Sequence, residues 1–78
     1  MIQTDGLPAL IAAADTALKT AEVQIGPVEL VRGGRMVLIR LYGEISAVQA
    51  AVDAGIKAAL QITPRAIGSV IGRPQLTI

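Results

Sequence analysis

Two stretches of the chain repeat apolar residues at intervals of three and four, the period of an amphipathic helix. The first runs from about residue 5 to residue 21, and its apolar stripe consists of Leu7, Leu10, Ile11, Ala14, Ala17 and Leu18. The second starts near residues 44–46 and should stop before Pro64, because a residue that precedes proline is disfavoured in a helix. Its stripe consists of Val48, Val52, Ile56 and Leu60. We expect two helices, each with its stripe against a sheet.

Both predicted helices begin with a capping signal. Asp5 followed by Pro8 suits the start of the first helix, since an aspartate side chain can cap it and proline is tolerated in the first turn. Ser46, with Gln49 three positions later, has the form of a capping box at the start of the second helix.

The remaining apolar stretches are typical of strands. They comprise Met1 to Thr4, Val23 to Val31 with a bend at Gly26-Pro27, Arg35 to Tyr42, and Ile67 to Ile71. A turn at Gly33-Gly34 separates the second strand from the third. The order β-α-β-β-α-β predicts a split β-α-β, ferredoxin-like α/β (α+β) fold, in which two helices cover one face of a four-stranded antiparallel sheet. A chain of 78 residues is expected to form one domain, over residues 1–78.

The two predicted helices share a sequence repeat. Residues 12–19 and 50–57 both follow the pattern Ala-Ala-x-Asp-x-x-aliphatic-Lys. In each copy the aspartate precedes the lysine by four residues, the favourable order for an ion pair along a helix, so we expect the pairs Asp15–Lys19 and Asp53–Lys57. Chance repetition in an alanine-rich chain is the alternative reading.

The composition indicates self-association. Hydrophobic residues make up 53% of the chain and charged residues only 17%, which is more apolar than an ordinary soluble domain. Without cysteine, the chain has no disulfide or thiolate metal site to support so small a core, and oligomerisation is the remaining route. Part of the apolar surface is therefore expected to meet another subunit.

The same composition argues against several function classes. The chain has no histidine or cysteine and its acidic residues are scattered singly, so we expect neither an enzyme nor a cofactor. A net charge of +1 and a single aromatic residue, Tyr42, disfavour nucleic-acid binding. No apolar stretch is long enough to span a membrane and no secretory signal is visible, which predicts a cytosolic protein.

Two short basic segments each allow two readings. Gly33-Gly34 between Arg32 and Arg35 is a hairpin turn with solvated arginines, or a small loop that presents backbone N–H groups and guanidinium charge to an anion. Arg73-Pro74 is a surface tail, or a rigid turn that anchors a subunit contact.

Four segments in the same order resemble the bacterial microcompartment shell domain. Residues 1–7 are similar to its opening G-M-I-E-T-K-G-L, and Ala13 to Lys19 to its A-A-D-x-x-x-K helix. Residues 43–55 are similar to its G-D-V-x-A-V-x-A-A-x-x-A-G, and residues 71–74 to its closing I-P-R-P. The resemblance covers nearly the whole chain.

This resemblance implies a structural shell protein that forms cyclic homohexamers, or trimers where two domains are fused, and tiles with other shell proteins around an enzyme core. It also implies a central pore for small polar metabolites. By carry-over, Arg32, Gly33, Gly34 and Arg35 line the pore, where repeated arginines favour anions. The resemblance also implies that Asp5, Arg73 and Pro74 lie at subunit contacts, with Asp5 in place of the family's lysine. The alternative function is a regulatory domain of ferredoxin-like fold that binds a small anionic ligand.

Overall fold

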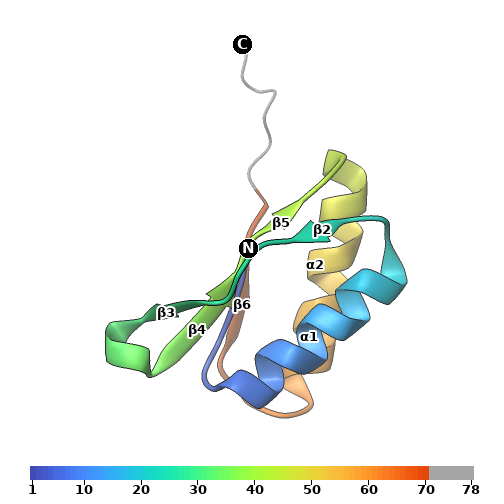
Figure 1. Cartoon of the computed structure of the whole chain (residues 1–78). Coiled ribbons are helices and arrows are strands. Elements are labelled where there is room, and N and C mark those ends of the chain that lie inside the picture. The colour runs from blue at the N-terminus through green and yellow to red at the C-terminus, as the bar shows by residue number, and fades with distance from the viewer. Residues whose placement is uncertain (71–78) are drawn as a thin grey trace.

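The computed structural model describes residues 1–70, which form a four-stranded sheet, a two-stranded ribbon and two long helices (Figure 1). The elements in chain order are β1 Ile2–Thr4, α1 Leu7–Thr20, β2 Gln24–Ile25, β3 Glu29–Val31, a 3-10 turn Arg32–Gly34, β4 Met36–Ile39, β5 Leu41–Tyr42, α2 Ile45–Leu60 and β6 Ala66–Gly68. The four-stranded sheet has the order β3-β4-β1-β6, and all its neighbours are antiparallel. The predicted split β-α-β fold is confirmed.

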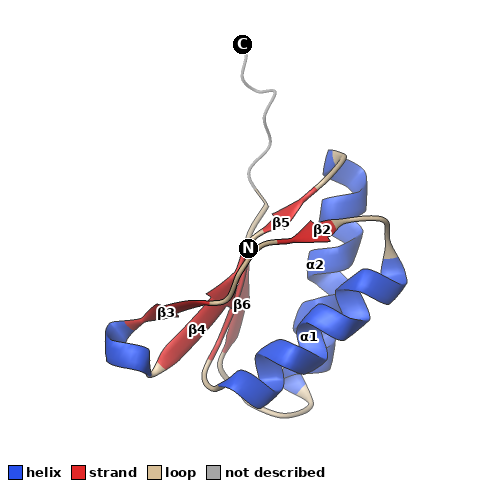
Figure 2. Cartoon of the chain, viewed as in Figure 1, coloured by secondary structure: helices blue, strands red, loops and turns tan. Residues whose placement is uncertain are grey.

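Both helices cover the same face of the sheet (Figure 2). Ile2 and Thr4 of β1 are fully buried, and the register pairs them with Ile39 and Val37 of β4. Because side chains alternate across a strand, Gln3 points to the opposite, uncovered face with its partners Leu38 and Ile67. The sheet therefore has a core face under the helices and an opposite face that neither helix covers, on which neighbouring side chains still bury Leu38.

The second and third predicted strands are each divided in two. β2 and β3 are separated at Gly26-Pro27, the expected bend. The single strand predicted from Arg35 to Tyr42 is wrong, since it is interrupted at Arg40. The cause lies across the hairpin, where Pro27 has no N–H to donate; the Gly26 N–H donates to the Arg40 carbonyl at 2.9 Å and keeps the two halves connected.

The buried face of α1 differs from the predicted stripe. Leu10 and Ala17 are buried as expected, together with Ala9 and Ala13. Leu7, Ile11 and Leu18, however, are about half exposed, at 46%, 58% and 54%. The inner face consists mostly of alanines because α2 packs closely against α1 there, and the larger aliphatic side chains lie outside that contact.

The predicted aspartate cap of α1 is also wrong. Asp5 extends β1 instead, since its N–H donates to the Arg65 carbonyl at 3.0 Å, and Gly6 takes the N-cap position at a φ of 102°. The Asp5 carboxylate lies near Arg65 and caps no helix N–H group. The proline in the first turn is confirmed.

Glu44, rather than Ser46, caps α2. Its carboxylate accepts hydrogen bonds from the backbone N–H groups of Ser46 and Ala47 at 3.1 and 3.2 Å, and from the Ser46 hydroxyl. The predicted capping box of Ser46 with Gln49 is therefore wrong, because the helix begins one residue earlier, at Ile45. The helix ends at Leu60, before Pro64 as expected.

One of the two predicted ion pairs is present. Lys19 Nζ lies 3.0 Å from Asp15 Oδ2, on the exposed side of α1. In the described part of the chain Asp53 forms no ion pair with Lys57, and it accepts a hydrogen bond from Gln49 Nε2 at 3.4 Å instead. Neither α1 nor α2 is long and apolar enough to cross a membrane.

Gly55 is a point of close packing in the core. A Cβ at this position would lie 2.7 Å from Ile2 Cδ1 and 3.1 Å from the Ala13 carbonyl oxygen. Only a residue without a side chain lets α2 approach both α1 and the central strand β1 at this point. The alanine-rich interface between the helices depends on this approach.

We expect Gly55→Ala to destabilise the protein by about 1–3 kcal/mol through overpacking, although alanine is favoured over glycine in a helix by about 1 kcal/mol. Chemical denaturation measures the change. Ala50→Gly, on the exposed side of the same helix, is the control for helix propensity alone. A Gly55→Ala variant as stable as the wild type would show that the contact is not tight.

The cap at Glu44 gives the second prediction, on acid stability. Hydrogen bonds from the Ser46 hydroxyl and the Ala47 and Ser46 N–H groups lower the pKa of Glu44. The ionised Glu44 cap therefore stabilises the folded protein fully above the ordinary glutamate pKa of about 4.3. This stabilisation is lost as the pH falls through the lowered pKa of Glu44 in the folded state. Glu44→Gln should weaken the protein at neutral pH and flatten the loss of stability below about pH 4.3.

Thermal unfolding of both proteins from about pH 2.5 to about pH 7, a range that spans the ordinary glutamate pKa, measures this difference in stability. Glu22→Gln, after the C-terminal end of α1, removes the same charge without touching a cap and should leave the acid loss as in the wild type. Parallel pH curves for wild type and Glu44→Gln would contradict the assignment.

Candidate functional site

The predicted pore residues form a tight turn between β3 and β4. Arg32, Gly33 and Gly34 have positive φ values of 52°, 66° and 89°, and the Arg35 N–H closes the turn onto the Arg32 carbonyl at 3.3 Å. The turn residues are all exposed. The predicted turn with positive-φ glycines is confirmed, and the structure adds a third such residue, Arg32, which sequence reasoning missed.

The turn projects away from the helices at the free end of the hairpin (Figure 1). β3 is an edge strand, and its Leu30 shares the helix-facing side with Val37 by register. Leu30 is nevertheless 70% exposed, because the helices do not extend over this end of the sheet. The turn and the end of the hairpin are thus presented to other molecules rather than to the chain's own core.

A hollow of about 680 Å³ lies beside the turn on the uncovered side of the sheet. Charged residues from three segments line it, namely Asp5 after β1, Arg32 and Arg35 in the turn, and Arg65 before β6. The Arg65 Nε atom is 4.0 Å from the Asp5 Oδ2 atom, and both side chains are largely exposed. The structure therefore brings Asp5, a predicted contact residue, together with two of the predicted pore residues.

Arg65 is the site residue that the sequence analysis missed. It follows Pro64, which was used only as a helix stop, and nothing nearby in the sequence connects it with Asp5. The pairing of β1 with β6 brings the two residues together across 60 positions. Arg73 and Pro74, the other predicted contact residues, lie outside the described residues.

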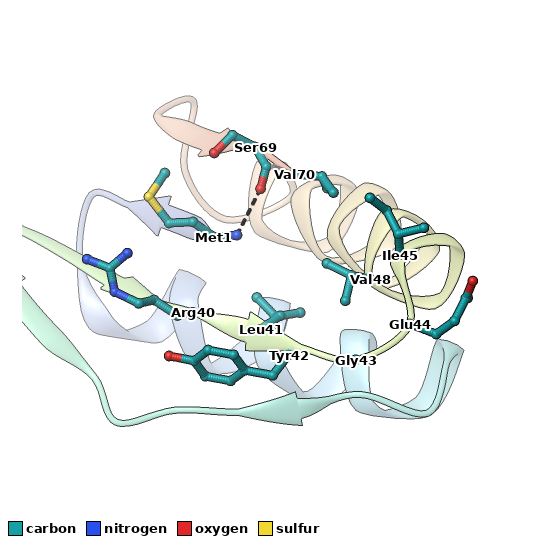
Figure 3. A pocket seen from close by; sticks show the side chains of 10 residues that line it. All are labelled: Met1, Arg40, Leu41, Tyr42, Gly43, Glu44, Ile45, Val48, Ser69 and Val70. Atoms are coloured by element: carbon teal, nitrogen blue, oxygen red, sulfur yellow. Dashed lines mark hydrogen bonds between the residues drawn. The ribbon is translucent and has the colours of Figure 1, made fainter. Parts of the chain in front are cut away.

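A second hollow, of about 750 Å³, lies between β5, the start of α2 and the end of β6 (Figure 3). Its lining is mainly apolar, with Leu41, Tyr42, Ile45, Val48 and Val70. Its two charged side chains lie at opposite ends and are already engaged: Arg40 pairs with Glu29 at 2.8 Å, and Glu44 caps α2. This arrangement carries no pair of groups placed for acid-base chemistry.

The fold, the unused apolar surface and the exposed basic turn define the class of a small structural protein built to associate. Comparison with known proteins identifies the family: the BMC domain model matches residues 1–74, and the chain belongs to the BMC domain family. The predicted resemblance is thereby confirmed.

Curated relatives agree with this assignment. The chain is 41% identical over 76 residues to the carboxysome shell protein CcmK2 of Synechocystis sp., covering 95% of the chain and 73% of the relative. It is 37% identical over 78 residues to the microcompartment shell protein PduA of Citrobacter freundii, covering 100% and 83%. It is 40% identical over 74 residues to EutM of Salmonella typhimurium, covering 95% and 76%. These relatives are structural shell proteins, which confirms the expectation of a non-catalytic role and does not favour the regulatory-domain alternative.

The positive φ of Arg32 generates a prediction on stability. A non-glycine residue in the left-handed region costs about 1–2 kcal/mol, so Arg32→Gly should stabilise the protein by about 1 kcal/mol. Arg35 has an ordinary helical φ of −74°, so Arg35→Gly removes the same charge but should destabilise by about 0.5–1 kcal/mol. Denaturant titration compares the two. Equal changes in the free energy of unfolding for the two variants would mean that the backbone strain does not lie at Arg32.

Proposed function

We propose that this chain is a structural tile of a bacterial microcompartment shell, acting as one BMC domain over residues 1–78 and assembling with copies of itself into rings of six. Membership of the BMC domain family is the observation that carries the proposal. The rings would associate edge to edge and with other shell proteins, as the names of the relatives indicate for those proteins.

The exposed apolar surface supports assembly. Large hydrophobic side chains of the described residues are left 43–70% exposed, and they occur on helices, strands and loops alike: Leu7, Ile11, Leu18, Val28, Leu30, Tyr42, Ile45, Leu60, Ile62 and Ile67. Exposed apolar side chains that gather in one patch mark interaction surfaces in soluble proteins. Three of these side chains, Leu7, Ile11 and Leu18, follow one line along α1, which gives a partner a continuous strip to cover.

The turn at residues 32–35 supports a role at the centre of a ring. It is the exposed tip of a projecting hairpin, and it carries two arginines that pair with no carboxylate in the described part of the chain. Repeated around a ring axis, these arginines would make a cationic opening that favours anionic solutes over neutral ones. Small polar or anionic metabolites are the proposed cargo of this pore.

The mass of the assembled species tests the proposal. We expect light scattering to give about six chains per particle, and negative-stain images of the same sample to show sheets or closed particles. Ile11→Asp places a charge in the exposed α1 strip and should lower the mass, whereas Lys19→Gln on the same helix lowers the net charge by the same one unit and is the control. A stable monomer, dimer or trimer in the wild type would overturn the ring of six.

The pore charge is tested once rings are established. Replacing Arg32 and Arg35 by serine should leave the particle mass unchanged and reduce the passage of anionic solutes relative to neutral ones. An unchanged ratio in intact assemblies would contradict the pore assignment without affecting the shell assignment.

A further inference from the structure

The hollow beside the turn is lined by residues of a single chain. Its lining comes from the end of β1, the 32–35 turn with Met36, and residues 64–67, which the sheet pairing brings to the uncovered face. A volume of about 680 Å³ lies within the range of small-molecule sites. The fold of a single chain therefore brings together all the residues that line this hollow.

The charges around this hollow do not balance. Three guanidinium groups, of Arg32, Arg35 and Arg65, share it with one carboxylate, that of Asp5. Asp5 lies beside Arg65 at 4.0 Å, and neither Arg32 nor Arg35 forms an ion pair within the described residues. The hollow thus has a surplus of two positive charges, carried by side chains that are free to bind a ligand.

We propose that this hollow binds a phosphoryl group, either as inorganic phosphate or as the phosphate of a small ester. A phosphate monoester carries a charge of about −1.5 to −2 at neutral pH, which matches the surplus, whereas a monocarboxylate would neutralise only half of it. Guanidinium groups also donate paired N–H bonds to phosphate oxygens. Arg65 distinguishes this site from the proposed pore, since it lies outside the 32–35 turn.

Calorimetric titration of the full chain at constant ionic strength tests the proposal. Inorganic phosphate and glycerol phosphate are the two ligands, and acetate is the anion of comparison. Arg65→Gln should weaken phosphate binding roughly tenfold or more, as expected when a hydrogen bond to a charged group is lost. Arg40→Gln is the matched control, because Arg40 loses the same charge but pairs with Glu29 outside this hollow.

Asp5→Asn provides a test in the opposite direction. The Asp5 carboxylate competes with an anion for Arg65 and repels it, so its neutralisation should strengthen phosphate binding several-fold. The backbone bond from the Asp5 N–H to Arg65 is retained in this variant. A variant that failed to fold would lose affinity for phosphate, so a gain of affinity cannot be explained by unfolding.

Each outcome separates the hollow from its alternatives. Binding of both ligands, with the affinity falling in Arg65→Gln and rising in Asp5→Asn, supports a phosphoryl site; a preference for the ester identifies an organic phosphate as the ligand. Equal losses in Arg65→Gln and Arg40→Gln, acetate binding as tight as phosphate, or loss only in the Arg32 and Arg35 variants would overturn it. Light scattering of every variant reports the ring separately, so that a failure of assembly is not mistaken for a failure of binding.

Discussion

The close approach of α2 to β1 and α1 at Gly55 is the contact on which the packing of the helices depends. With a hydrogen in place of a side chain, the helix lies close enough to cover Ile2, and the opposing helix meets it at Ala13. Alanine dominates the rest of this contact, since larger side chains would separate the helices. The result is a thin core that small residues fill and that two helices and one sheet face enclose.

A thin core has a consequence for the outer surface. In a chain of this length, small residues inside leave many of the larger aliphatic side chains outside, as Ile11 and Leu18 on α1 and Ile67 on β6 show. Each isolated domain buries little apolar area and gains correspondingly little stability. Covering that outer surface with neighbouring copies would add the burial that the core lacks, so the inner packing and the tendency to assemble are two results of one distribution of side-chain sizes.

Elements with a strong local signal were predictable from the sequence, whereas their partners in space were not. The helical periods, the stop before Pro64 and the Gly33-Gly34 turn are properties of a few neighbouring residues, and they are present as expected. The α1 stripe was wrong in part because periodicity shows that Ile11 is apolar but not whether α2 leaves room for it. Asp5 was assigned to a cap because its pairing with Arg65 depends on the strand order.

The charged residues of the candidate site were likewise only partly predictable from the sequence. The two arginines of the turn were visible as a basic segment, but the hollow requires Arg65 and Asp5, which only the antiparallel neighbours of β1 bring alongside. By the family resemblance Asp5 takes the place of a lysine, and Arg65 lies beside it at the same corner of the uncovered face. This corner therefore holds a cation and a carboxylate 4.0 Å apart. An exposed pair at this distance contributes little to stability, so an anion bound by Arg65 would displace the Asp5 carboxylate at little cost to the fold.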